Sequence, residues 1–185
     1  MTCIVGYAVD GNVYMGGDSA GVGEGYSLQI RAEEKVFLKG SMIFGFTTSF
    51  RMGQLLRYEL EIPKHEDNLS DMEYLCSVFI KAVINCFRDN GFLTTSGSVI
   101  EGGVFLIGYR GKVYYVDDDF HIANLKTPFT ACGCGGQIAL GAMEVLVNSG
   151  SPVCKPAKAV KRALSAAGAH SAGVSGPYVV KCLGE

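Results

Sequence analysis

The second residue of the chain, Thr2, carries a hydroxyl that could act as a nucleophile. It follows the initiator Met1 directly and opens a strand-like run. Removal of Met1 would give Thr2 a free α-amino group, which titrates near ~7.7–8.0 and is therefore partly neutral at physiological pH. The amine could then take the proton from the hydroxyl of the same residue without any histidine. We therefore expect Thr2 to supply both the nucleophile and the base.

Three later residues stand at the ends of strand-like segments, where they could support such a nucleophile. Asp18 ends the second segment, Lys35 opens the third and Gly45 closes the fourth. Taken singly, these are an ordinary turn aspartate, an edge-strand lysine and a strand glycine. Only their combination with Thr2 and with the order of elements favours a catalytic role.

The first part of the chain alternates strand-like segments with turns. Residues 2–9 and 12–17 flank Asp10-Gly11, and this dipeptide between two apolar runs predicts a hairpin. Residues 35–38 and 42–46 predict a second hairpin. We expect the Gly-rich segment 18–25 to form a loop between them.

Helical periodicity begins at Ser49 and predicts a helix that ends near Pro63. Ser70 and Glu73 form a capping box that opens a longer helix, which closes near Asn90. Strands are expected at 103–109, 113–116 and 129–133, helices at 137–148 and 156–167, and a last strand at 178–181. Two helix pairs that alternate with hairpins predict an α+β fold in four αββα layers, with two antiparallel sheets between flanking helices.

Length and composition limit the classes of protein. The 185 residues are 48% hydrophobic, which suits a single domain over residues 1–185. A net charge of -2 with dispersed basic residues argues against nucleic acid as a partner. No run approaches the ~20 apolar residues that cross a bilayer, so no membrane partner is expected. The N-terminus lacks the basic region of a secretory signal, and we expect a cytoplasmic protein.

The seven cysteines are odd in number and follow no regular framework, which indicates reduced thiols. We expect five of them to be small buried hydrophobic residues: Cys3, Cys76, Cys86, Cys154 and Cys182. Because no cysteine or histidine has metal-site spacing, we expect no metal and no cofactor. The acidic triplet 117–119 is expected to form a solvated turn, although it could hold a cation.

The joint pattern of these motifs resembles the β-subunits of proteasomes, and most closely the HslV-type peptidases, which are N-terminal nucleophile hydrolases. The opening MTCIVGYAVDGNVYMGGD is similar to that family's MTTIV followed by a turn and a GD pair. The similarity continues through Glu34-Lys35-Val36, through residues 43–46 and through Gly133-Cys134-Gly135-Gly136, where the family has GSGG. It covers nearly the whole chain.

The resemblance implies a role for each position in a threonine endopeptidase. Lys35 would lie beside the Thr2 hydroxyl, favour the ionised oxygen and lower the proton affinity of the amine by like-charge repulsion. Asp18 would orient and neutralise Lys35. Gly45 would donate its N–H to the oxyanion, a donor whose loss typically costs ~2.7–4 kcal/mol. Ile43 and Thr47 would be substrate-binding, with Ile43 lining an apolar pocket for the residue before the scissile bond.

Two departures from the family pattern concern the surroundings of the terminal amine. Cys134 replaces the family serine near that amine and is a weaker hydrogen-bond donor. The segment 167–176 lacks the aspartate that proteasome subunits place there, and Ser171 or Ser175 could supply a hydroxyl instead. An inactive ring-forming scaffold subunit and a small-molecule amidase on the same fold are therefore alternative functions.

The resemblance also implies partners. It implies protein or peptide substrates, homo-oligomeric stacked rings whose active sites face an inner chamber, and an ATP-dependent unfoldase of the AAA+ class. Six-fold and seven-fold rings are both open.

Overall fold

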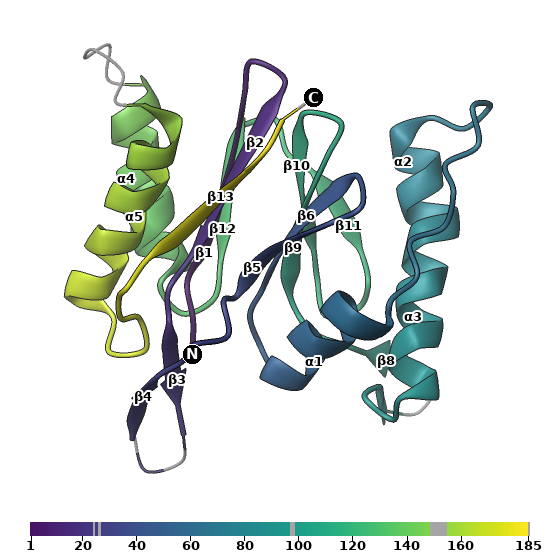
Figure 1. Cartoon of the computed structure of the whole chain (residues 1–185), viewed down its shortest axis with the longest axis horizontal. Coiled ribbons are helices and arrows are strands. Elements are labelled where there is room, and N and C mark those ends of the chain that lie inside the picture. Colours follow the sequence, from purple (N-terminus) through teal and green to yellow (C-terminus); the bar gives the residue numbers. More distant parts are fainter. Residues whose placement is uncertain (24, 26, 97–98, 149–154, 185) are drawn as a thin grey trace.

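Two antiparallel sheets lie at the centre of the computed structural model, which describes residues 1–23, 25, 27–96, 99–148 and 155–184 (Figure 1). The first sheet has the order β12-β1-β2-β13, with β1 (Ile4–Val9), β2 (Asn12–Gly17), β12 (Phe129–Cys132) and β13 (Val179–Leu183). The second has the order β11-β10-β9-β6-β5, with β5 (Val36–Lys39), β6 (Met42–Phe46), β9 (Phe105–Tyr109), β10 (Lys112–Val116) and β11 (Ile122–Asn124). Both predicted hairpins, β1–β2 and β5–β6, are present.

Helices cover the outer face of each sheet. The helices α4 (Gly136–Asn148) and α5 (Pro156–His170) pack on the first sheet. The second sheet is covered by α1 (Phe50–Gln54), the π-helical turn η2 (Leu55–Glu59), and the continuous run of α2 (Asp71–Tyr74), η3 (Leu75–Phe79) and α3 (Ile80–Asp89). The molecule is the predicted four-layer αββα sandwich in the α+β class.

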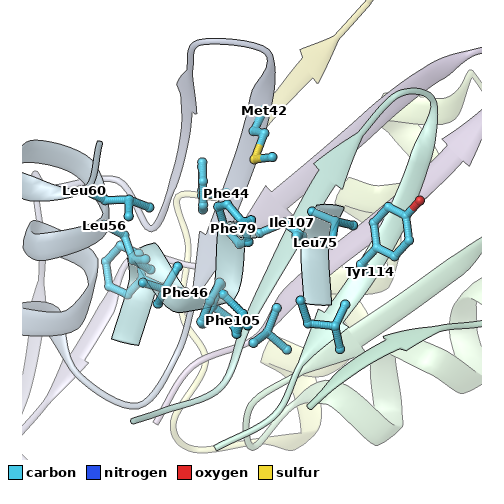
Figure 2. Close-up of a cluster of buried hydrophobic side chains, with 14 of the residues drawn as sticks. Met42, Phe44, Phe46, Leu56, Leu60, Leu75, Phe79, Phe105, Ile107 and Tyr114 are labelled. Carbon is cyan, nitrogen blue, oxygen red and sulfur yellow. The ribbon is translucent and has the colours of Figure 1, made fainter. Parts of the chain in front are cut away.

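Three apolar clusters hold these layers together. The largest fills the space between the second sheet and α1–α3, where Phe44 and Phe105 of the strands meet Leu56 and Phe79 of the helices (Figure 2). A second lies between the first sheet and α4–α5. A third lies between the two sheets and includes Ile4, Met15 and Ile43. Burial of apolar area on this scale is the main force that stacks the layers.

The capping box forms as predicted: the Ser70 side chain accepts from the Glu73 N–H, and the Glu73 carboxylate accepts from the Ser70 N–H. The helix predicted to run to Pro63 instead ends with the π-helical turn at Glu59.

Several short strands were not predicted. Within segment 18–30, β3 (Ala20–Val22) pairs with β4 (Leu28–Ile30), so the predicted loop is in fact a small hairpin. A similar pair, β7 (Thr94–Ser96) and β8 (Val99–Glu101), follows α3. Three residues are too few for a recognisable alternation of apolar and polar side chains.

The cysteines differ in part from the prediction. Cys3 is buried and Cys86 is half-buried, but Cys76 and Cys182 are exposed, so the prediction was wrong for these two. Cys154 lies outside the described residues. In the acidic triplet, the Asp117 and Asp119 carboxylates accept the N–H groups of Asp118 and His121 and thereby shape a turn. Among the described residues, no helix has both the length and the apolar character needed to cross a membrane.

Candidate active site

The first hairpin brings the start of the chain against Asp18. The register of β1 and β2 pairs Ile4 with Gly17, so Cys3 lies opposite Asp18 just beyond the ladder. The Asp18 N–H donates to the Cys3 carbonyl at 3.2 Å, and the Cys3 N–H donates to Asp18 Oδ1 at 2.9 Å. Thr2, the preceding residue, is only 6% exposed.

The Lys35 ammonium joins Thr2 to Asp18. Its Nζ donates to Thr2 Oγ1 at 2.9 Å, to the two Asp18 carboxylate oxygens at 3.0 and 3.1 Å, and to the Ala20 carbonyl at 2.6 Å. Asp18 also accepts from the N–H groups of Cys3 and Ala20. The ammonium and the carboxylate are therefore fully hydrogen-bonded, which makes the burial of both charges tolerable.

Burial governs the ionisation of these groups. The pKa of Lys35 is lowered because burial disfavours its charged form, and Asp18 offsets part of this effect by its negative charge and its hydrogen bond. Burial, followed by the charge of Asp18, raises the pKa of the Cys3 thiol to about 12. Cys3 thus stays protonated beside Thr2 and does not compete as a nucleophile.

The turn between β12 and α4 holds the other side of Thr2. The Thr2 N–H lies 3.3 Å from Cys134 Sγ, and the Gly135 N–H donates to the Thr2 carbonyl at 3.3 Å. Gly133 has a φ of +89°, and a Cβ there would lie 2.2 Å from the Thr2 carbonyl oxygen, so only glycine fits. Of the two candidate serines, Ser171 is the one that reaches this group, with its Oγ 3.5 Å from Cys134 Sγ.

Met1 covers the nitrogen of Thr2. Its side chain packs against Gly173, where an added Cβ would lie 2.4 Å from Met1 Cβ; the same position lies 2.8 Å from Cys134 Sγ. Met1 is 51% exposed, and its carbonyl accepts the Thr2 hydroxyl. While Met1 is present, the nitrogen of Thr2 is an amide that cannot act as a base.

Two residues predicted to line the site lie elsewhere. Gly45 pairs with Leu106 of β9, and two residues later the Thr47 N–H donates to the Val104 carbonyl. Because N–H groups two residues apart on a strand point to the same side, the Gly45 N–H also points into the ladder with β9. Its vacant side-chain position faces Ile4 and Met15 in the core. Ile43 is fully buried between the sheets. The predictions for Gly45 as oxyanion donor and Ile43 as pocket wall were therefore wrong.

The turn that joins β6 to α1 lies beside Thr2 instead. Thr47 is buried there, and both its N–H and its hydroxyl donate to the Val104 carbonyl. Thr48 has a φ of +50°, a strained backbone conformation for a β-branched residue, and its N–H has no hydrogen-bond partner among the described residues. A free N–H held at a strained turn is a suitable donor to an oxyanion.

Two cavities meet at this turn. A cavity of about 80 Å³ is lined by Thr2, Lys35, Val22 and the turn 46–50. A second, of about 150 Å³, lies beyond Phe46 and Phe50, which belong to the walls of both. Its other walls are Glu33, Glu34, Gly53, Gln54, Arg57 and Tyr58. Sequence periodicity identified Phe46 as a strand residue and Phe50 as a helix residue, but gave no signal that both rings would border the cavity at Thr2.

No family model matches the chain, and no curated protein matches it in sequence. Solved structures match it over almost its full length. The Thiobacillus denitrificans protein BPH in complex with epoxomicin has a TM-score of 0.79 at 18% identity, with 98% of this chain and 97% of that chain covered. A eukaryotic HslV from Trypanosoma brucei has a TM-score of 0.70 at 14% identity, with both chains covered completely. The chain therefore has the fold of HslV-type peptidase structures, the N-terminal nucleophile hydrolase fold.

Proposed function

We propose that this chain is a threonine endopeptidase of the HslV and proteasome type, in which Thr2 becomes the nucleophile after removal of Met1. The observation that carries this proposal is the 2.9 Å hydrogen bond from Lys35 Nζ to Thr2 Oγ1, made while Lys35 is paired with Asp18. A buried cation beside a hydroxyl stabilises the alkoxide character that develops on attack. The shared fold supports the same activity.

The reaction would proceed in two stages. The neutral α-amine of Thr2 takes the hydroxyl proton, Oγ1 bonds to the substrate carbonyl carbon, and the electron pair of the carbonyl moves to its oxygen. The Thr48 N–H is the donor we assign to this oxyanion, in place of Gly45. The C–N bond then breaks and the leaving nitrogen takes the proton from the amine, which leaves an ester on Thr2. Water activated by the same amine hydrolyses the ester.

The cavity beyond Phe46 and Phe50 would receive the side chain that precedes the scissile bond. Its three aromatic walls favour an apolar side chain, and a space of about 150 Å³ is large enough for a benzene-sized ring. Its two carboxylates are already paired, Glu33 with Arg31 and Glu34 with Lys181. A lysine or arginine in this pocket would therefore lose hydration without gaining a free counter-ion, and peptides with basic residues at this position should be poor substrates.

Mass and activity measurements test the function. We expect the intact mass of the purified protein to lack one methionine, and hydrolysis of fluorogenic peptides to disappear in Thr2→Ala. Epoxomicin, which is bound in the Thiobacillus denitrificans protein, should modify the wild-type chain and leave Thr2→Ala unmodified. A retained Met1 without activity would favour the scaffold alternative. Turnover of small amides without turnover of peptides would favour the amidase.

We also propose that the protein assembles into homo-oligomeric rings in the cytoplasm and receives substrates from an AAA+ unfoldase, as the resemblance implies. The protomer has a mass of 19.7 kDa. Size-exclusion chromatography with light scattering measures the mass of the assembly and therefore gives the number of subunits. A monomer with full peptidase activity would contradict the assembly without affecting the assignment of Thr2.

A further inference from the structure

Lys35 precedes an edge strand. In the second sheet β5 pairs only with β6, so one side of its backbone has no neighbouring strand in that sheet. The Lys35 carbonyl faces β6, where it accepts the Phe46 N–H at 3.1 Å. The Glu34 carbonyl, one residue earlier and outside β5, is not part of this ladder. An edge of this kind needs another partner if the adjacent residue is to be held accurately.

Arg57 supplies that partner. Its Nη2 donates to the carbonyl of Glu34, the residue directly before Lys35. At the other end of β5, the Lys39 ammonium donates to the Arg57 carbonyl at 2.8 Å. One residue of the helical layer is therefore bound to both ends of the strand.

The local structure of η2 fixes the position of Arg57. The residue lies in the middle of the π-helical turn, and single π-turns within helices are frequent at functional sites. Its guanidinium lies 4.5 Å from the ring centroid of Phe37, a β5 residue, which restricts its motion further. The Glu34 carboxylate makes a separate ion pair with Lys181 at 2.8 Å, but both of these side chains are partly exposed.

We infer, on the basis of the function proposed above, that Arg57 is a positioning residue that fixes the Lys35 ammonium against Thr2 by holding the Glu34 carbonyl. Arg57 does not itself approach the reacting atoms: it acts through the backbone of residues 34 and 35. A displacement near 1 Å at a reacting centre can lower a rate by about 100-fold. Loss of the Arg57 contact should therefore slow acylation of Thr2 by roughly 10- to 100-fold.

The test must separate this role from the position of Arg57 in the wall of the second cavity. A small β-lactone without a side chain acylates Thr2 without entering that cavity, so its rate constant reports on the nucleophile alone. We expect Arg57→Met to slow this acylation and to lower kcat for peptides more than it raises KM. Arg57→Lys should recover part of the rate, because it keeps the charge but not the planar fork. Thermal unfolding would establish that each variant is folded at the assay temperature.

Two controls complete the design. Arg51→Met removes an exposed arginine from α1 and should have wild-type kinetics. Lys181→Met removes the ion pair between Glu34 and Lys181 but leaves Glu34 intact, and should also acylate at the wild-type rate.

Three results would overturn the role of Arg57: unchanged acylation in Arg57→Met with a raised KM, a Lys181→Met defect as large as that of Arg57→Met, or, should Arg57→Met not fold, a wild-type rate in Arg57→Lys. Absence of acylation at Thr2 in the wild-type protein would instead refute the proposed function.

Discussion

Cys134 Sγ lies 3.3 Å from the backbone nitrogen of Thr2, although 132 residues separate them in the chain. The same sulfur lies 3.5 Å from Ser171 Oγ, so the thiol connects the C-terminal segment to the nitrogen that would serve as the base. Cys134 stands where the HslV-type family has a serine, so this difference from the family lies in contact with the proposed catalytic amine. A thiol is a weaker hydrogen-bonding group than a hydroxyl.

This contact predicts opposite effects for two substitutions of Cys134. Cys134→Ala removes the acceptor near the amine, and a hydrogen bond with a net value of about 0.5–1.5 kcal/mol corresponds to a loss of roughly 2- to 13-fold in kcat/KM. Cys134→Ser supplies a stronger partner of similar size and should keep or raise kcat/KM. Peptide hydrolysis measured on both variants decides the matter. Equal activity of the alanine variant and the wild-type protein would show that the sulfur does not orient the amine.

Thr48 should tolerate glycine better than alanine. Both variants lose the hydrogen bond that Thr48 Oγ1 accepts from the Val104 N–H, but only glycine relieves the strain of a φ of +50°. A left-handed conformation costs an L-residue roughly 1–2 kcal/mol. We therefore expect the free energy of unfolding of Thr48→Gly to exceed that of Thr48→Ala by about 1 kcal/mol.

Both Thr48 variants keep the backbone N–H that we assign to the oxyanion, so kcat should change little in either. Urea unfolding and peptide kinetics on the same preparations test this pair of expectations. A large loss of kcat in both variants would mean that the Thr48 side chain takes part in the reaction.

Charge placed in the second cavity should change the preferred substrate. Gln54 lines this cavity from the exposed face of α1, so its replacement disturbs little packing. Gln54→Glu should favour peptides with lysine or arginine before the scissile bond, and Gln54→Lys should disfavour them. Exposed charge pairs contribute about 0.2–1 kcal/mol, so changes in kcat/KM of up to roughly fivefold are expected. Identical profiles for the two variants would place the substrate side chain in another pocket.

Alkaline pH should destabilise the protein through buried acidic groups. Burial raises the pKa of Tyr74 and of Tyr114 to about 12 from an ordinary value of 10.0, and the pKa of Cys3 to about 12 from 9.0. A raised pKa means that the folded state holds its proton more tightly than the unfolded state. The stabilising contribution is therefore complete below pH 9 and is lost as the pH rises towards 12.

Denaturant unfolding across this pH range, followed together with tyrosinate absorbance, measures the effect. We expect the free energy of unfolding to fall above pH 9, and Tyr74 and Tyr114 to ionise only as the protein unfolds. Ionisation of Tyr74 and Tyr114 near pH 10 without loss of structure would contradict the assignment.

Features that depend on neighbouring residues were predictable from the sequence. The hairpin at Asp10-Gly11 and the capping box of Ser70 and Glu73 formed as predicted, because turn and cap chemistry involves residues within four positions of each other. The cluster of Thr2, Asp18 and Lys35 was expected from the resemblance to HslV-type peptidases, whose motifs these three positions match. The structure brings these three side chains together with Cys134.

Only the tertiary structure decided which residues of segment 43–50 lie beside Thr2. Alternation along β6 turns Ile43 and Gly45 towards the other sheet. The strained turn at Thr48 borders the same cavity as Thr2, and its N–H has no partner in the part of the chain that the structure describes. A shift of one residue reverses the face of a strand, and no local pattern fixes that register. The contact of Arg57 with the Glu34 carbonyl likewise arises where a π-helical turn meets an edge strand. The sequence by itself determined the main hairpins and helices and the candidate residues Thr2, Asp18 and Lys35, whereas packing between distant segments determined which backbone groups surround them.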